Sequence, residues 1–290
     1  MMKRVALATS REFAELTADE KLLTESLREL GFDAQPLIWD KPCQPPGEVA
    51  GIVIRSCWDY HKKSGEFLAW LDRLEKTGVK TLNAPAILRW NLDKIYLREL
   101  AERGVKIPPT AWFGKGENER LSAVLAVNGW RKAVLKPTIS ATAWRTFLVT
   151  PENADGLQSE FESLLVNGGA MVQKFVEEVR TRGEWSFIFF DKIFSHAVLK
   201  RAGAGDFRVQ NDFGGSVETS LEPAPALVEE AQRTVNYIAE DLTYARVDGV
   251  EIAGELCLME FELIEPVLFL EHHELAAQKF AAAIVSRLDA

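Results

Sequence analysis

The chain has few cysteines and none of the long apolar runs that mark secreted or membrane proteins. Its three cysteines, Cys43, Cys57 and Cys257, are scattered and lack CxxC spacing, so the sequence predicts neither a disulfide framework nor a zinc site. The apolar run at residues 4–9 is too short for a signal peptide or a membrane span. We therefore expect a cytoplasmic protein that does not bind membranes.

Basic residues are also fewer than acidic residues. The sequence has 34 Lys and Arg against 43 Asp and Glu, and its net charge is −9. Proteins that bind nucleic acids carry a basic face for phosphates, so this balance argues against that class, and an anionic substrate would need a local basic pocket. The pattern GxxxxGK followed by Ser or Thr does not occur, which disfavours a P-loop nucleotide site.

The acidic stretch at residues 244–266 is the most informative part of the chain. It predicts a β-hairpin with arms at 245–252 and 256–264 and a turn at Ala253-Gly254. Because side chains alternate along a strand, Glu260 and Glu262 lie on one face, and antiparallel pairing brings Asp248 beside them. A solvated polar face is the alternative, but the surrounding run is strongly apolar. Carboxylates on rigid strands suit magnesium, so we expect a site for one or two Mg²⁺ ions and a nucleotide nearby.

The N-terminal part predicts a parallel α/β domain. Apolar runs at 4–9, 33–39 and 49–55 read as strands, and residues 18–30 have apolar positions at helical spacing. Ligands in open α/β sheets bind beyond the carboxyl ends of strands, so the residues that follow the third strand are substrate candidates. The alternative is that they form a capping and packing cluster. These residues are Arg55, Trp58, Asp59 and Tyr60.

The middle of the chain predicts helices at 64–76 and 86–104, the second a long amphipathic stretch that ends in glycine, with a domain boundary between 85 and 110. Lys136 ends a strand at 132–137 and precedes a loop of small residues at 138–144. Small residues let backbone amides approach phosphates, and a lysine beside them supplies a charge. The alternative for Lys136 is an ordinary surface position.

Antiparallel strands are predicted from residue 169 onward. The runs at 169–176, 183–190 and 192–200 read as strands, with a tight turn at Asp191-Lys192, and helices are expected at 223–242 and 276–288. Lys200, Arg201 and Arg208 gather around the glycines at 203 and 205. In a chain of negative net charge this basic group indicates an anion site, and the alternative is a solvated loop.

Five motifs in this order resemble the ATP-grasp superfamily of ADP-forming ligases, in particular glutathione-synthetase-like members that include the cyclo-ligases closing O-ureido-serine to cycloserine. The resemblance covers essentially the whole chain. It implies an N-terminal α/β domain at 1–95, a small central α+β lid domain at 96–175 and a C-terminal antiparallel-sheet domain at 176–290, with ATP between the last two. The motifs lie at residues 91–94, 135–137, 171–176, 183–186 and 259–266.

The resemblance also implies roles for individual residues. Lys94 and Lys136 would contact the nucleotide phosphates, and Lys200 and Arg208 would act in catalysis by holding the γ-phosphate and the acyl phosphate. Asp248, Glu260 and Glu262 would bind Mg²⁺, although relatives usually have Asn at the last position. Glu265 would join Arg55, Trp58, Asp59 and Tyr60 at the amino-acid substrate. The remaining residues would meet the adenine and ribose of ATP: Gln173, Lys174, Phe175, Val176, Glu178 and Glu184.

The implied reaction is the ATP-dependent formation of an amide through an acyl phosphate. A substrate carboxylate takes the γ-phosphoryl group of ATP, and an amine then displaces phosphate; if one molecule carries both groups, the product is a ring. The alternatives are a linear amino-acid or peptide ligase and a catalytically silent ATP-binding sensor. No protein nucleophile is required, so the four histidines are expected to pack or to face solvent. Related folds are often dimers, which makes a homodimer one expectation.

Overall fold

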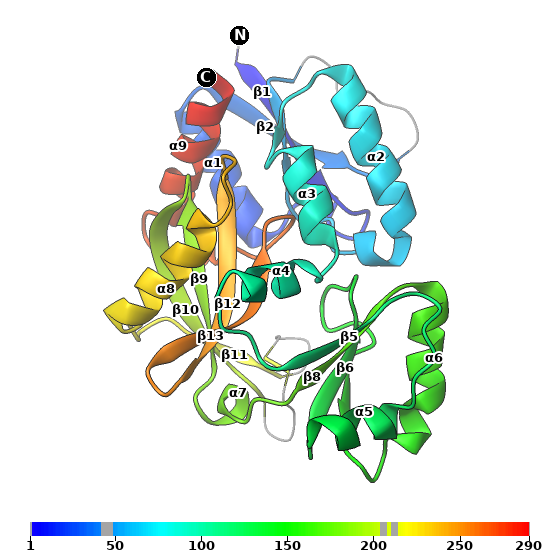
Figure 1. Ribbon diagram of the computed structural model, residues 1–290. Coiled ribbons are helices and arrows are strands. Elements are labelled where there is room, and N and C mark those ends of the chain that lie inside the picture. The colour runs from blue at the N-terminus through cyan, green and yellow to red at the C-terminus, as the bar shows by residue number, and fades with distance from the viewer. Residues whose placement is uncertain (1, 42–48, 204–207, 210–213, 290) are drawn as a thin grey trace.

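The computed structural model describes residues 2–41, 49–203, 208–209 and 214–289, which fold around three β-sheets (Figure 1). Cys43 and part of the predicted glycine-rich segment at 203–205 lie outside the described residues. The two ends of the chain meet, since the Lys3 ammonium lies 2.7 Å from the Asp289 carboxylate. None of the described helices is both long and apolar enough to cross a membrane.

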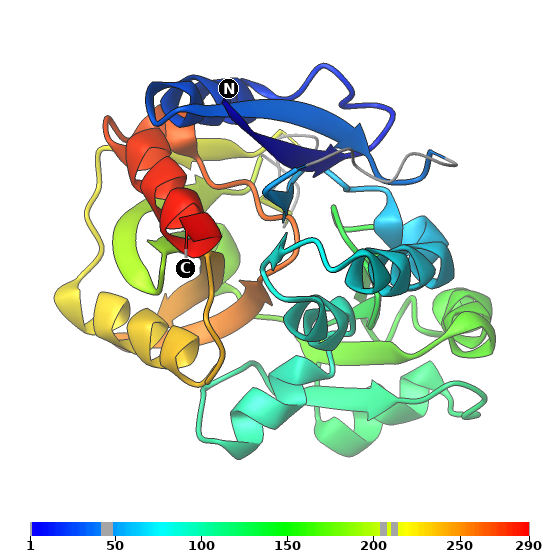
Figure 2. The same ribbon diagram turned by 90° about the horizontal axis from the view of Figure 1, so that it is seen from above.

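The first sheet is parallel and has the strand order β2-β1-β3-β4. Alternate residues of β1 face opposite layers: Val5 and Leu7 pack against α1 and α9, whereas Ala6 and Ala8 pack on the side of α2 and α3 (Figures 1 and 2). Both faces are therefore buried, as the sequence predicts. The strands are β1 (Lys3–Thr9), β2 (Phe32–Ile38), β3 (Gly51–Ile54) and β4 (Thr81–Leu82), and the helices are α1 (Ala18–Glu29), α2 (Ser64–Thr77), α3 (Pro85–Leu92) and α9 (Ala276–Asp289).

The second sheet is antiparallel and small, with the order β5-β8-β6-β7. Helices α5 and α6 cover its apolar face with a core that includes Phe161, Leu125 and Leu135. The alternation of buried and half-buried residues along β6 leaves Lys136 on the opposite face. The elements are β5 (Thr110–Phe113), α5 (Leu121–Asn128), β6 (Ala133–Pro137), β7 (Phe147–Val149), α6 (Gln158–Asn167) and β8 (Ala170–Lys174).

The third sheet is antiparallel and has the order β11-β10-β9-β12-β13. The predicted hairpins are both present: Asp191 and Lys192 have positive φ in the turn between β9 and β10, and Ala253 and Gly254 do so between β12 and β13. Helices α7 and α8 accompany this sheet. The elements are α7 (Glu178–Thr181), β9 (Glu184–Phe190), β10 (Ile193–Arg201), β11 (Ser216–Glu218), α8 (Pro225–Asn236), β12 (Tyr244–Ile252) and β13 (Glu255–Glu262).

The amphipathic stretch at 86–104 is helix-rich, as expected, but it contains two helices rather than one. Helix α3 ends at Leu92, Asp93 is extended, and α4 (Tyr96–Glu102) starts afresh. The break is stabilised by two contacts: the Asp93 carboxylate accepts from Ile95 N, and Lys94 N donates to Thr138 O. A helical residue 94 would donate its amide within the helix, so the break frees Lys94 to contact the loop after β6. Helix α8 is also shorter than the predicted 223–242.

Candidate functional site

A cavity of about 430 Å³ lies where the three sheets meet, and it is lined by residues from each part of the chain. Its walls include apolar side chains such as Val134, Val209 and Met259 beside many charged groups. Most of the residues singled out in the sequence lie in this lining: Trp58, Tyr60, Lys94, Lys136, Gln173, Lys174, Phe175, Val176, Glu184, Lys200, Arg208, Asp248, Glu260, Glu262 and Glu265.

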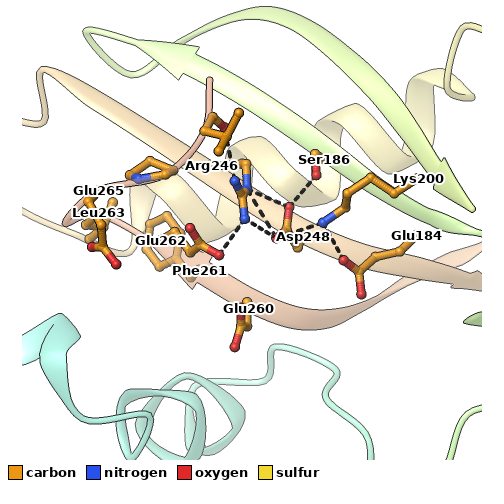
Figure 3. A network of polar contacts seen from close by, with 12 residues as sticks. Glu184, Ser186, Lys200, Arg246, Asp248, Glu260, Phe261, Glu262, Leu263 and Glu265 are labelled. Atoms are coloured by element: carbon orange, nitrogen blue, oxygen red, sulfur yellow. Dashed lines mark hydrogen bonds and ion pairs between the residues drawn. The ribbon is translucent and has the colours of Figure 1, made fainter. Parts of the chain in front are cut away.

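The acidic hairpin brings its three predicted carboxylates together. Asp248 on β12 is paired with Glu260 on β13, and ligand oxygens of Asp248, Glu260 and Glu262 all lie within 4.8 Å of one another (Figure 3). The register shifts after Asp248, where a bulge ends the regular pairing. Alternation along β13 and the antiparallel register are thus sufficient to build the cluster.

Arg246 lies at the centre of this cluster, although the sequence analysis gave it no role. Its guanidinium donates two hydrogen bonds to Asp248 Oδ2, at 2.9 and 3.2 Å, and one to Glu262 Oε1 at 2.5 Å. Its Nη1 donates to Val267 O. The signal was present in the sequence, because residues two apart on a strand share a face and Arg246 stands two residues before Asp248.

The buried charges shift one another's pKa values. Burial raises the pKa of Glu262 to about 8, and the neighbouring Asp248 and Glu260 add to that shift. Burial also opposes ionisation of Glu260 and Asp248, but the cations beside them hold both pKa values below the ordinary carboxylate value: Lys94 and Lys136 for Glu260, Arg246 and Lys200 for Asp248.

Three lysines from different elements line the cavity with the acids: Lys94 between α3 and α4, Lys136 on β6 and Lys200 on β10. Lys94 Nζ lies 2.9 Å from Glu260 Oε1 and donates to Ser140 O, so it joins the hairpin to the loop after β6. Lys200 Nζ lies 2.5 Å from Glu184 and 3.2 Å from Asp248. Lys136 lines the same cavity, and burial lowers its pKa. These positive groups form the local basic pocket that an anionic substrate needs in a chain of negative net charge.

The segment at the end of β8 contributes both polar and apolar residues to the cavity lining, from Gln173 to Val176. Gln173 is buried and donates to the Thr110 hydroxyl, while Lys174 N is bonded to Pro109 O and Phe175 N to Lys132 O. Phe175 and Val176 line the cavity beside this backbone. The loop at 138–146 lines it as well, and three of its residues, Thr142, Ala143 and Arg145, have positive φ.

Arg55, Asp59 and Glu178 do not line the cavity, unlike the other residues expected to meet a ligand. Arg55 is buried, donates to Pro266 O and lies over the rings of Tyr244 and Phe280. Asp59 accepts from Trp39 Nε1 and pairs with Lys63. The contacts of Arg55 and Asp59 are those of a capping and packing cluster, which was the alternative interpretation of the segment after β3.

Histidines stay out of the cavity lining, as expected. Burial lowers the pKa of His61 and of His196 to about 4, so both are neutral near pH 7. His196 is hydrogen-bonded to Leu268 O and stacks on His273, and the ring of His61 packs at an angle against Trp144 of the loop after β6. Cys57 and Cys257 are buried free thiols.

The cluster of Asp248, Glu260 and Glu262 suits Mg²⁺ by its chemistry. Three carboxylates offer the hard oxygen ligands that this ion takes in phosphate-binding sites. Burial raises the pKa of Glu262, and the neighbouring carboxylates Asp248 and Glu260 add to that rise, so the three acids repel one another when ionised. A divalent cation would offset this repulsion.

Comparisons with known proteins agree with this arrangement. A family model for the N-terminal domain of D-cycloserine synthetase DcsG matches residues 5–83. The chain is 30% identical over 296 residues to the cycloserine biosynthesis protein DcsG of Streptomyces lavendulae, with 98% of each chain covered. A crystal structure of D-cycloserine synthetase DcsG is 28% identical and has a TM-score of 0.86 over 98% of this chain and 99% of that chain.

The ATP-grasp ligase PsnB, solved with a phosphomimetic variant of its minimal precursor, Mg and ADP, has the same fold with a TM-score of 0.67. It is 15% identical, and 98% of both chains is covered. The ATP-grasp fold predicted from the five motifs is therefore confirmed.

Proposed function

Since the chain belongs to the DcsG family of ATP-grasp ligases, we propose that it is an ADP-forming ligase that activates the carboxylate of an amino-acid-like substrate as an acyl phosphate. We further propose that a nitrogen of the same molecule closes the ring, as in the conversion of O-ureido-serine to cycloserine. The cofactors are ATP and Mg²⁺. The observation that carries this proposal is the single cavity in which carboxylates of the hairpin face Lys94, Lys136, Lys200 and Arg246.

The residues of the cavity divide between the two ligands. Gln173, Lys174, Phe175 and Val176 hold the adenine, with Glu184 at the ribose, and Lys94 and Lys136 contact the phosphates. Asp248, Glu260 and Glu262 would hold Mg²⁺, and the ion would neutralise charge on the phosphates. The domain division at residues 95 and 175 stays part of this proposal.

The first half-reaction needs charge compensation and no protein nucleophile. The substrate carboxylate attacks the γ-phosphorus, the bond to the β-γ bridging oxygen breaks, and ADP leaves. Lys200, Arg208 and Arg246 lie in the cavity lining, where they offset the charge on the transferred group and on the oxygen of the activated carbonyl. Burial of Lys200 and Arg246 among acids keeps these two cations in fixed positions, so little reorganisation accompanies the transfer.

Two alternatives remain testable. A linear ligase would join two molecules through the same acyl phosphate, and a silent ATP-binding sensor would keep the nucleotide site without turnover. The sensor is the weaker alternative, because the metal acids and the phosphate lysines are present together in one cavity.

The test is Mg²⁺-dependent ADP release with both enantiomers of O-ureido-serine, amino acids and dipeptides, with products weighed by mass spectrometry. We expect ADP with one substrate alone. From O-ureido-serine we expect either the closed ring, lighter by one water, or cycloserine itself, lighter by a further HNCO because the carbamoyl group is also lost. ADP that appears only with a pair of substrates would indicate a linear ligase, and AMP in place of ADP would exclude the acyl phosphate. The Glu260→Gln variant should lose turnover, whereas a sensor that needs no metal would keep its ATP affinity.

A further inference from the structure

Among the described residues, five carboxylate side chains line the cavity, and one of them has no cation paired with it. Glu184 pairs with Lys200, Asp248 with Arg246 and Lys200, Glu260 with Lys94, and Glu262 with Arg246. Glu265, which is 8% exposed, has no basic partner among the described residues. Its side chain instead accepts a hydrogen bond from the Tyr60 hydroxyl. An unpaired buried carboxylate inside a ligand cavity is costly to ionise, which makes Glu265 a candidate functional residue.

The position of Glu265 separates it from the nucleotide side of the cavity. In Figure 3, Glu265 and Glu184 lie at opposite sides of the view with Glu262 and Asp248 between them. Glu184 is the residue placed at the ribose under the proposed function. Glu265 also shares its part of the lining with Trp58 and Tyr60, which follow strand β3 of the first sheet. Under the proposed function, Glu265 therefore lies on the side of the cavity that takes the amino-acid-like substrate.

The backbone around Glu265 is fixed by side chains rather than by a strand partner. Strand β13 ends at Glu262, and the carbonyls that follow accept bonds from distant parts of the chain. The Tyr244 hydroxyl donates to Ile264 O at 2.7 Å, Trp58 Nε1 donates to Glu265 O at 2.9 Å, and Arg55 Nη2 donates to Pro266 O at 2.7 Å. Three consecutive carbonyls are held in this way, so the Glu265 carboxyl is pre-positioned. Arg55 acts here as a positioning residue.

We propose that Glu265 is the general base that takes the proton from the attacking nitrogen of the substrate. This inference rests on the proposed function. The nitrogen attacks the acyl carbon, the new C–N bond forms, and the C–O bond to phosphate breaks with its electron pair leaving on inorganic phosphate. The N–H proton moves to a carboxylate oxygen of Glu265 and passes to solvent when the product leaves. The substrate class is an amino acid derivative that carries its own N–H nucleophile.

The environment of Glu265 suits a base that works near neutral to slightly alkaline pH. Burial raises its pKa to about 8, and Glu262 adds to that shift, while Lys94, the Tyr60 hydroxyl and Arg246 oppose it. Tyr244 and Cys57 are the other titratable groups that interact with it. The fraction of ionised Glu265 therefore rises through the range from about pH 7 to about pH 9.

The test is a rapid-quench comparison of wild type, Glu265→Gln and Glu265→Asp with ATP, Mg²⁺ and O-ureido-serine. Removal of a general base costs roughly 10²- to 10⁴-fold in rate. We expect Glu265→Gln to keep a burst of ADP, to yield a hydroxamate when hydroxylamine is added, and to make cyclised product at least about 100-fold more slowly. The Asp variant should recover part of the rate. Glu271→Gln, which changes an exposed acid further along the chain, is the matched control and should behave as wild type.

The pH profile of the wild type gives a second readout, which stands even if a variant fails to fold. In the wild type the rate of product formation should rise through about pH 8 while the ADP burst does not, and Glu265→Gln should lack that rise. Product formation by Glu265→Gln within about threefold of wild type, or equal losses of the ADP burst and of product, would overturn the assignment. Absence of ADP from the wild type would instead contradict the proposed function.

Discussion

Arg246 stands opposite Glu262 in the register of β12 and β13, and its guanidinium donates to Glu262 and to Asp248 on its own strand. One buried cation thus holds two of the three carboxylates proposed to bind Mg²⁺. The pairing keeps both acids in place before any ligand enters, and it makes the stability of the third sheet depend on the charge state of the site.

Replacement of Arg246 by Gln should destabilise the protein, because it leaves Asp248 and Glu262 buried with less positive charge beside them. Removing one partner of a buried ion pair costs about 3–5 kcal/mol. Urea unfolding measures the loss, and added Mg²⁺ should restore part of it if the ion binds the same acids. Arg182→Gln, which breaks an exposed pair with Glu251, is the control and should cost less than about 1 kcal/mol. Equal losses in the two variants would contradict the central role of Arg246.

Lys94→Met should weaken ATP binding. Lys94 joins Glu260 to the carbonyl of Ser140, so the change removes the proposed phosphate contact and releases the loop at 138–146 from the hairpin. Loss of one charged hydrogen bond is worth about 1.5–3 kcal/mol, which corresponds to roughly a 10- to 150-fold rise in Kd. Calorimetric titration with a non-hydrolysable ATP analogue measures the change. Lys3→Met, which removes a surface pair with Asp289, is the control, since neither residue lines the cavity. An unchanged Kd for Lys94→Met would place ATP elsewhere.

Strand alternation and antiparallel pairing were enough to predict the acid cluster, because both rules act over a few residues. The same rules would have identified Arg246, which shares a face with Asp248. The helix break at Asp93 was not predictable from periodicity, since Leu92 and Leu97 continue the apolar pattern across it. It depends on the contact between Lys94 N and Thr138 O, which are far apart in the sequence.

The substrate candidates after β3 show a second limit. The rule that ligands bind beyond the carboxyl ends of parallel strands selected Arg55, Trp58, Asp59 and Tyr60 as a group, but only Trp58 and Tyr60 line the cavity. The direction of each side chain is set by tertiary contacts: Arg55 lies against Tyr244 and Phe280, and Asp59 against Trp39. No local pattern encodes these partners.

Asn83 is predicted to be among the most important polar residues for stability. Its side-chain amide donates to Tyr244 O and Leu263 O, and its carbonyl accepts from Thr243 N, so it joins the first sheet to both ends of the acidic hairpin. Asn83→Ala leaves these buried groups unpaired, and we expect a loss of roughly 2–4 kcal/mol in the free energy of unfolding. Asn128→Ala, at an exposed helix end, should cost less than about 1 kcal/mol. Similar unfolding midpoints for the two variants would contradict the bridging role.

The stability of the protein in metal-free buffer should depend on Glu265 in a defined pH range. The pKa of Glu265 is about 8 in the folded state and 4.5 for an ordinary glutamate, so the folded state binds a proton that the unfolded state lacks between these values. The contribution of Glu265 is therefore complete below about pH 4.5 and is lost as the pH rises towards 8, at up to about 1.4 kcal/mol per pH unit.

Histidines restrict the range in which this effect is visible. The pKa values of His61 and His196 are about 4 in the folded state against 6.5 ordinarily, so their contribution is lost as the pH falls below about 6.5 and opposes that of Glu265 there. Between pH 6.5 and 8 the contribution of these histidines is complete and no longer changes with pH, and we expect the urea midpoint of the wild type to fall as the pH rises. Glu265→Gln should make this limb less steep, because a neutral amide cannot lose the proton. Glu262, whose pKa is also raised to about 8, supplies the slope that remains, and Glu271→Gln should retain the wild-type slope. An unchanged slope in Glu265→Gln would mean that Glu265 is already ionised in the folded protein at pH 6.5, and the cavity would then have to supply a cation to it.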